Sequence, residues 1–391
     1  MAALAQRQGP TKSVGTEAMG NHTGTPHKVL LLGPRRAGKS SLCKVVYQSF
    51  QPNDTLFLAP TTKTQKLPVQ TFQRLEILDI PGSVFQAFVP NLNDASLVAT
   101  ANESGFDTSW KDTSAVIFVI DAQDDYFDAL SKLHQVILHA YRNNPGIHFH
   151  IFINKVDGLS DDYKYDTQRD IEQRVFEELI DSSHEFQENH SEPFRLESEV
   201  NLRFHLTSVF ESSVFVAFSR IQQRLMQTEN SRSASTTEVP AEEQVEVVPS
   251  PDKLVSLGDG IEAACNSLCS SCNFEKAYIF DMPSRTFVGC DTSPFDLPLF
   301  DVMFQYIRFL GSFSELYTSS IADETTVKRS YSSSVVRLGS ESSVAFWQLN
   351  SHLALFVSVR TSIYTNNQGI LDYNLHHFRK TVDQLEQLAI S

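Results

Sequence analysis

The stretch "HKVLLLGPRRAGKSSLCKVVYQSF" (27–50) decides the fold class. It opens with an apolar run that predicts a buried strand, and it closes with apolar residues at helical spacing. Between the two lies the pattern G-x-x-x-x-G-K-S, which runs from Gly33 to Ser40. A strand, a glycine loop and a helix in this order predict a phosphate-binding loop in an α/β domain.

The residue types of this loop suit a bound polyphosphate. Gly33 and Gly38 allow a tight wrap that points backbone N–H groups at a central hollow. The helix that follows adds its unpaired N–H groups and the positive end of its dipole. Lys39 supplies a point charge for the outer phosphates, and the Ser40 hydroxyl is a suitable ligand for Mg²⁺.

A second motif favours guanine over adenine. "HFHIFI" (148–153) predicts a buried strand, and N-K-V-D follows at its carboxyl end, where open parallel sheets bind ligands. Asp157 can accept two hydrogen bonds from guanine, and adenine lacks that pair of donors. We expect Asn154 to tie this loop to the phosphate loop and to contact the base edge, and the Lys155 stem to lie across the ring.

Two further segments extend the predicted site. In "RLEILDIPGS" (74–83), Asp79 ends a strand and is placed to hold Mg²⁺ through water, while the N–H of Gly82 can reach a γ-phosphate. The polar loop "NDTLFLAPTTKTQ" (53–65) offers Thr61 as the residue that reaches Mg²⁺ only when a γ-phosphate is present.

Two alternatives stay open around these segments. Thr62 and Thr64 are rivals of Thr61 for the magnesium role. Downstream, a strand ends at Thr207 and Ser208, and the backbone there can support the guanine O6; this assignment rests on position alone.

The residue after Gly82 bears on catalysis. Phosphoryl transfer to water needs a group that orients the attacking water, commonly a glutamine after D-x-x-G. This chain has Ser83, whose hydroxyl is too short for that role. We therefore expect slow unaided hydrolysis, with a partner protein completing the site.

Nine segments carry a family resemblance: "GPRRAGKSS", "LFLAPTTK", "LDIPG", "FVIDAQDDY", "NKVDGLSDD", "TQRDI", "NFEKAYIFD", "DTSPFD" and "GILDYNLHHFRK". Together they resemble Rag-type GTPases of the C/D branch, whose fungal members are the second Gtr protein. The similarity covers about 27–226 and 253–388. It implies a Ras-like P-loop GTPase domain followed by a roadblock (longin-like) α/β domain, with GTP or GDP and Mg²⁺ as ligands.

The resemblance also implies partners and a place in the cell. It implies a heterodimer with an A/B-branch Rag GTPase through the C-terminal domain, on a Ragulator- or EGO-type scaffold. It implies a cytoplasmic protein recruited to the lysosomal or vacuolar membrane. There the pair signals amino-acid sufficiency to target of rapamycin complex 1, with the C/D subunit active when GDP-bound. A nucleotide-bound scaffold with negligible hydrolysis is the alternative.

The residues carried over by resemblance fall in the motifs above. The phosphate-binding positions are Gly33, Arg35, Arg36, Gly38, Lys39, Ser40 and Ser41; the switch threonine is Thr61; the base readers are Lys155 and Asp157. Arg35 and Arg36 alternatively form a solvated pair. The branch has histidine where this chain has Asn154, and it commonly keeps glutamine at Ser83. The stretch that follows, 84–110, is longer than the family pattern implies.

Composition and charge exclude some classes of function and indicate how the chain is divided into domains. The 391 residues carry a net charge of −15 and show no basic stripe, so no nucleic-acid partner is expected. The longest apolar runs are far below the ~20 residues that span a bilayer, so we expect membrane association only through partners. Composition shifts predict a disordered 1–26, a GTPase domain at 27–226, a linker or surface loop at 227–252 and a dimerisation domain at 253–391.

Two tempting features have plainer explanations. "CNSLCSSC" (265–272) has spacing that can hold an iron–sulfur cluster, but its cysteines continue an apolar helical stripe, which favours core packing. "DAQDDY" (121–126) resembles paired catalytic carboxylates, but its position favours a strand end and a helix cap.

Overall fold

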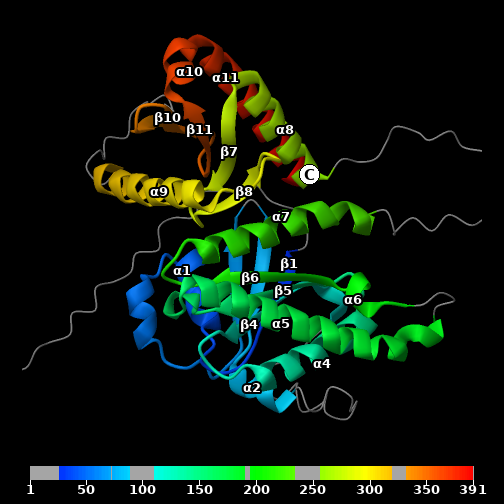
Figure 1. The fold of residues 1–391 in the computed structure, drawn as a ribbon. Helices are drawn as coiled ribbons and strands as arrows, with labels where there is room; N and C mark the ends of the chain where they lie inside the picture. The colour runs from blue at the N-terminus through cyan, green and yellow to red at the C-terminus, as the bar shows by residue number, and fades with distance from the viewer. Residues whose placement is uncertain are drawn as a thin grey trace, which may run out of the picture.

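The computed structural model describes residues 26–71, 73–88, 110–189, 194–233, 256–318 and 332–390. They form two sheets with helices packed against each (Figure 1). The predicted segment 1–26, apart from its last residue, and most of the predicted linker lie outside these ranges.

The first sheet has the order β2-β3-β1-β4-β5-β6. Its strands are β1 (His27–Leu32), β2 (Gln65–Gln70), β3 (Arg74–Asp79), β4 (Thr113–Asp121), β5 (His148–Asn154) and β6 (Asn201–Thr207). Every neighbouring pair is parallel except β2 and β3. The predicted mostly parallel sheet is therefore confirmed, with one antiparallel strand at its edge.

Helices cover both faces of this sheet. They are α1 (Lys39–Tyr47), α2 (Gly82–Phe88), α4 (Phe127–Asn143), α5 (Asp161–Ser182), α6 (Leu196–Glu199) and α7 (Ser213–Ser233). Alternate residues of β4 point to opposite faces: Ile117 lies in the core with α1 and α7, and Val116 in the core with α4 and α5. Because both faces are buried, strands such as β4 are continuous apolar runs.

The second sheet has the order β8-β7-β11-β10-β9, and all its pairs are antiparallel. Its elements are α8 (Leu257–Cys272), β7 (Phe274–Asp281), β8 (Thr286–Cys290), α9 (Leu297–Thr318), β9 (Ser333–Leu338), β10 (Ser342–Gln348), β11 (Leu353–Arg360), α10 (Thr361–Asn366) and α11 (Gln368–Ile390). This is the predicted order of helix, two strands, helix, strands and helix. The predicted fold class, a P-loop GTPase domain followed by a roadblock-type α/β domain, is confirmed.

Helix α7 lies between the two sheets and packs on both (Figure 1). Toward the first sheet, Phe218 makes an edge contact with Phe152. Toward the second, the ring of Phe215 packs against that of Phe304 of α9 with centroids 4.4 Å apart, and the Ser219 hydroxyl accepts the N–H of Phe287 at 2.9 Å. One hydrophobic core therefore runs through α7 from sheet to sheet.

Helix α7 also extends seven residues into the predicted linker, to Ser233. Residues 227–239 contain neither glycine nor proline, and glutamine, glutamate and arginine are good helix formers, so the chain has no local reason to leave the helix at 226.

The core-packing prediction for the cysteine segment is confirmed, and the aspartate segment ends a strand as predicted but provides no side-chain cap from the N-cap residue of the next helix. Cys265 and Cys272 are buried in the core between α8, α11 and the second sheet, which confirms the core-packing prediction. Asp121 ends β4 as expected. The residue before α4 is Tyr126, without a side-chain cap; the Asp125 carboxylate accepts the N–H of Phe127 at 3.1 Å.

The apolar stripe of α11 packs against α8 and the second sheet of its own chain. Its buried members are Leu371, Leu375, Phe378 and Val382. Within the described residues, no helix combines the length and apolar character that crossing a membrane requires.

Candidate functional site

A pocket of about 610 Å³ opens at the carboxyl ends of the strands of the first sheet. Eleven predicted site residues line it: Arg35, Arg36, Gly38, Lys39, Ser40, Ser41, Thr61, Gly82, Asn154, Lys155 and Asp157. The motifs that are far apart in the sequence therefore meet at one edge, because parallel strands present their carboxyl ends together.

Both glycines of the loop after β1 have backbone conformations that favour glycine. Gly33 has a φ of +135° and Gly38 a φ of +97°. A Cβ on Gly33 would lie 2.3 Å from the carbonyl oxygen of Val119, and one on Gly38 would lie 2.4 Å from Nδ2 of Asn154. The loop can therefore pack against β4 and β5 only with glycine at both positions.

Lys39 is buried at the base of the loop. Its Nζ donates to the carbonyl oxygens of Gly33 and Pro34, each at 2.8 Å. Burial lowers the pKa of this ammonium to about 8, and the Asp79 carboxylate partly offsets that effect. A desolvated ammonium beside a hollow gains most from a new negative charge, which is what a phosphate supplies.

Three hard oxygen donors meet beside the lysine. The Ser40 Oγ lies 2.7 Å from the Thr61 Oγ1 and donates to Oδ2 of Asp79. The other carboxylate oxygen of Asp79, Oδ1, is buried and has no hydrogen-bond partner within the described ranges. Burial raises the pKa of Asp79, against the opposing effects of the Ser40 hydrogen bond and of two lysines. Oxygen donors with an unsatisfied buried carboxylate oxygen fit a divalent cation.

The structure distinguishes Thr61 from the two alternative candidates for the magnesium role, Thr62 and Thr64. Thr61 contacts Ser40, whereas Thr62 is exposed. The hydroxyl of Thr64 is buried and has no hydrogen-bond partner in the described part of the chain. Of the three, Thr61 therefore lies at the oxygen cluster.

Gly82 and Ser83 begin α2 at the pocket rim. A Cβ on Gly82 would lie 2.5 Å from the backbone N of Arg35, so this turn also needs glycine to approach the phosphate loop. Ser83 is exposed and does not line the pocket. Arg35 and Arg36 are exposed residues on the pocket wall.

A chain of hydrogen bonds joins the N-K-V-D loop to the phosphate loop and to β6. Asn154 Nδ2 donates to the carbonyl oxygen of Ala37 at 2.8 Å, and the Thr207 hydroxyl donates to Asn154 Oδ1 at 3.2 Å. The Ser208 hydroxyl donates to Oδ1 of Asp157 at 2.5 Å. The side chains of Thr207 and Ser208 thus position Asn154 and Asp157, whereas sequence reasoning considered only the backbone of Thr207 and Ser208.

Two residues that sequence reasoning missed hold Lys155. Its Nζ forms an ion pair with the Asp121 carboxylate, and its carbonyl accepts Nε2 of Gln123 at 2.7 Å. Lys155 has a φ of +65°, in the left-handed region. Asp121 ends β4 and stands directly opposite Asn154 in the parallel register with β5, and this register is known only from the structure.

A sequence profile of the Gtr1/RagA G protein conserved region matches residues 28–239. "GTP-binding protein gtr2" of Schizosaccharomyces pombe is 33% identical over 370 residues, which cover 92% of this chain and 98% of that protein. The chain belongs to the Gtr1/RagA G protein family.

Other members of the family also align along nearly the whole chain. The human "Ras-related GTP-binding protein C" is 31% identical over 93% of this chain and 78% of its own length. "GTP-binding protein GTR2" of Saccharomyces cerevisiae is 31% identical over 91% and 92%. A solved structure of the mammalian SRP receptor aligns with 47% of this Gtr1/RagA-family chain and 92% of its own, at 19% identity and a TM-score of 0.32, too low to support an inference.

Replacing Lys39 by methionine should stabilise the nucleotide-free family member. At pH 7 the folded chain holds a buried ammonium whose pKa is about 8 rather than the ordinary 10.5, so its removal should raise the free energy of unfolding by up to about 3 kcal/mol. Denaturant titration of EDTA-treated protein measures this.

The difference should depend on pH. Between pH 8 and 10.5 the unfolded chain still binds the Lys39 proton and the folded chain does not, so wild-type stability rises with pH in this window. The gap between wild type and Lys39→Met should therefore narrow from pH 8 to pH 10. A gap that stays constant would show that the ammonium is not desolvated.

Proposed function

We propose that this chain is a guanine-nucleotide-dependent molecular switch, a Rag-type GTPase that binds GTP and GDP. One observation carries the proposal: the phosphate loop and the N-K-V-D loop line a single pocket and are bonded to each other through Asn154. The names of the relatives, which are GTP-binding proteins, support it.

The base is proposed to bind at the β5 and β6 end of the pocket. Asp157 accepts two hydrogen bonds from guanine there, and Ser208 fixes the orientation of its carboxylate. Val209 and Phe210 line the same end and offer apolar contact. An adenine would leave this carboxylate without donors, which is the basis of discrimination.

Mg²⁺ is proposed to bind at the oxygen cluster. Ser40 and Thr61 would be ligands, and Asp79 would hold the ion directly or through water. When bound, the ion neutralises negative charge on the phosphate oxygens. The unsatisfied Oδ1 of Asp79 supports this assignment.

The switch itself is proposed to lie in Thr61 and Gly82. Both reach the phosphate end of the pocket from segments outside the phosphate loop, so a γ-phosphate can hold both and its loss can release both. The exposed Ser83 points to slow unaided hydrolysis that depends on a GTPase-activating protein.

A specific observation keeps the scaffold alternative open. The residue at the position of the water-orienting glutamine is a short, exposed serine that does not line the pocket. A subunit that binds nucleotide without hydrolysing it does not need a water-orienting side chain at this position.

The second α/β unit is proposed as the dimerisation domain, with an A/B-branch Rag GTPase as partner. Its described surface exposes large apolar side chains on α9 and β9: Leu297, Val302, Phe309, Val335, Val336 and Leu338. We further propose the Ragulator- or EGO-type scaffold, target of rapamycin complex 1 and the lysosomal or vacuolar surface as its setting. Mass spectrometry of chains that co-purify with the native protein should find an A/B-branch subunit in equal amount; recovery as a monomer alone would refute the heterodimer.

Asp157→Asn should lower the affinity for GDP by at least about 100-fold and raise that for xanthosine diphosphate. The amide replaces one acceptor by a donor, which matches the carbonyl of xanthine. Calorimetric titration with both nucleotides measures the change.

The matched control for this variant is Asp162→Asn, at an exposed position of α5 outside the pocket. It should leave both affinities unaltered. An unchanged preference in Asp157→Asn would remove the base-reading role.

Single-turnover hydrolysis of GTP separates the switch from the scaffold. The purified chain should hydrolyse GTP no faster than about 10⁻⁴ s⁻¹, and a GTPase-activating protein should raise the rate by about 10³-fold or more. No acceleration by an activating protein would favour the scaffold. Fast unaided turnover would contradict the role assigned to Ser83.

A further inference from the structure

A second cavity, about 510 Å³, lies where the two sheets meet. Its walls come from β5, β6 and α7 on one side and from α8 and β8 on the other. Both β6 and β8 are edge strands of their sheets, and α7 runs between them (Figure 1). The cavity is separate from the pocket of the phosphate loop, with which it shares no lining residue.

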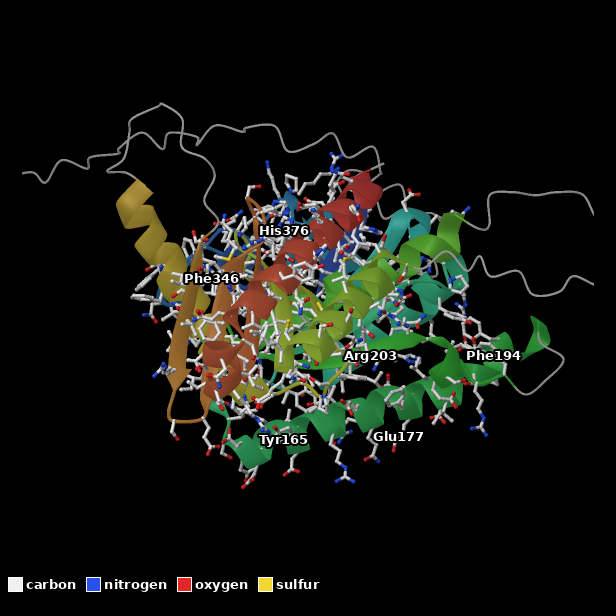
Figure 2. The ribbon with its side chains drawn as sticks, turned by 90° about the horizontal axis from the view of Figure 1, so that it is seen from above. Tyr165, Glu177, Phe194, Arg203, Phe346 and His376 are labelled. Carbon is white, nitrogen blue, oxygen red and sulfur yellow. The ribbon has the colours of Figure 1, made fainter. Side chains whose placement is uncertain are left out.

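The charge of this cavity is opposite to that of the protein. Arg203, Arg220 and Arg224 line it together with a single carboxylate, that of Glu262. The formal charge of its walls is therefore +2 with histidines neutral, in a chain whose net charge is −15. Figure 2 labels Arg203, which lies on β6.

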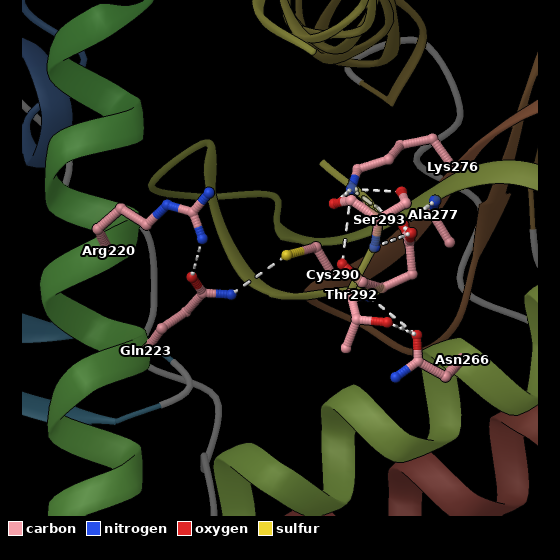
Figure 3. A network of polar contacts seen from close by, with 9 residues as sticks. Arg220, Gln223, Asn266, Lys276, Ala277, Cys290, Thr292 and Ser293 are labelled. Atoms are coloured by element: carbon pink, nitrogen blue, oxygen red, sulfur yellow. Dashed lines mark hydrogen bonds and ion pairs between the residues drawn. The ribbon is translucent and has the colours of Figure 1, made fainter. Parts of the chain in front are cut away.

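The guanidinium of Arg220 is held in place without a carboxylate partner among the described residues. It lies 5.4 Å from the ring centre of Phe287 and 5.2 Å from that of Phe295. Its Nη1 donates to Gln223 Oε1 at 3.1 Å, and Gln223 Nε2 contacts the Cys290 sulfur at 3.7 Å (Figure 3). This chain of contacts joins α7 to β8 and fixes the orientation of the Arg220 guanidinium.

A histidine pair forms the deep wall. His150 and His205 stack at 5.3 Å, and Nδ1 of His150 lies 3.1 Å from Nε2 of His205. Burial first, and then the neighbouring arginines, lower the pKa of His205 to about 4; burial, the other histidines and the arginines lower that of His150 well below its usual value. Both rings are therefore neutral at pH 7.

The second ring nitrogen of His150, Nε2, is buried and has no hydrogen-bond partner in the described part of the chain. His150 is only 2% exposed, so bulk water cannot satisfy this atom. When His205 Nε2 carries the shared proton, His150 Nε2 is an N–H donor. Because this nitrogen has almost no accessible surface, it does not face the cavity directly.

We propose that this cavity is a binding site for a small organic oxyanion with an apolar body. Arginine forks recognise phosphate and carboxylate groups in a bidentate manner, and three arginines, Arg203, Arg220 and Arg224, line this cavity. Val288, Phe295 and Met226 line the same cavity and suit the apolar part. The volume lies in the range of small-molecule sites. Because its walls belong to both sheets, an occupant would bridge the two halves of the chain.

The test uses the full chain saturated with GDP and Mg²⁺, so that the phosphate loop is occupied. Phenyl phosphate and phthalate are titrated at constant ionic strength, with phenol as the neutral counterpart. Binding of phenyl phosphate alone assigns the site to phosphate esters, and binding of phthalate alone assigns it to carboxylates. No binding of either oxyanion, or equal binding of phenol, would overturn the proposal.

Two variants and a control locate the binding. Arg203→Gln should weaken it about tenfold, and the Arg203→Gln, Arg224→Gln double variant should weaken it further. Arg169→Gln, an exposed position on α5 away from the cavity, is the matched control and should change nothing. Equal affinity in all three would place the ligand elsewhere and refute the site.

Nitrogen NMR of the histidine side chains distinguishes binding in this cavity from a general effect of lost positive charge. The ring signals of His150 should shift on binding, and those of the surface residue His376 should not. Unmoved His150 signals at saturating ligand would contradict the proposal. Far-UV circular dichroism serves as the fold check for every variant, so the outcome does not depend on the switch function proposed above.

Discussion

The hydrogen bond from Asn154 to the carbonyl oxygen of Ala37 holds the two halves of the pocket together. It crosses from the end of β5 to the phosphate loop, and Asn154 Nδ2 lies so close to Gly38 that a Cβ there would overlap it. The two loops therefore cannot move apart independently. A site for a molecule with a polyphosphate at one end and a base at the other needs this fixed separation.

The rest of the pocket is arranged around that bond. Thr207 orients the Asn154 amide from β6, and Asp121 and Gln123 hold the adjacent Lys155 from β4. Each of these side chains stands at the carboxyl end of a parallel strand, so the sheet register supplies the alignment. Charged groups are concentrated at the phosphate end of the pocket. There the ammonium of Lys39 is desolvated, and Oδ1 of Asp79 has no hydrogen-bond partner in the described part of the chain.

The sequence predicts the fold and the pocket residues where their signals are local. The phosphate loop, the N-K-V-D loop and Gly82 need particular residue types at fixed spacing, and the parallel sheet follows from alternating apolar strands and helices. The ion pair of Asp121 with Lys155 depends on a register between strands 34 positions apart, which spacing along the chain does not encode. The cavity between the sheets depends on how α7 docks on β8, so residues such as Arg203 and Cys290 come together only in three dimensions.

Helix α7 packs against both sheets, so substitutions on either of its packed faces would disturb a buried contact. It buries Val214 and Phe218 against the first sheet's core, while Phe215 packs against α9 and Ser219 caps an edge amide of β8. A protein truncated after this helix would expose the apolar side chains of α7 that pack on the second sheet, and this exposed surface would promote self-association. Because the two halves share one hydrophobic core through α7, we expect them to unfold together and not as independent modules.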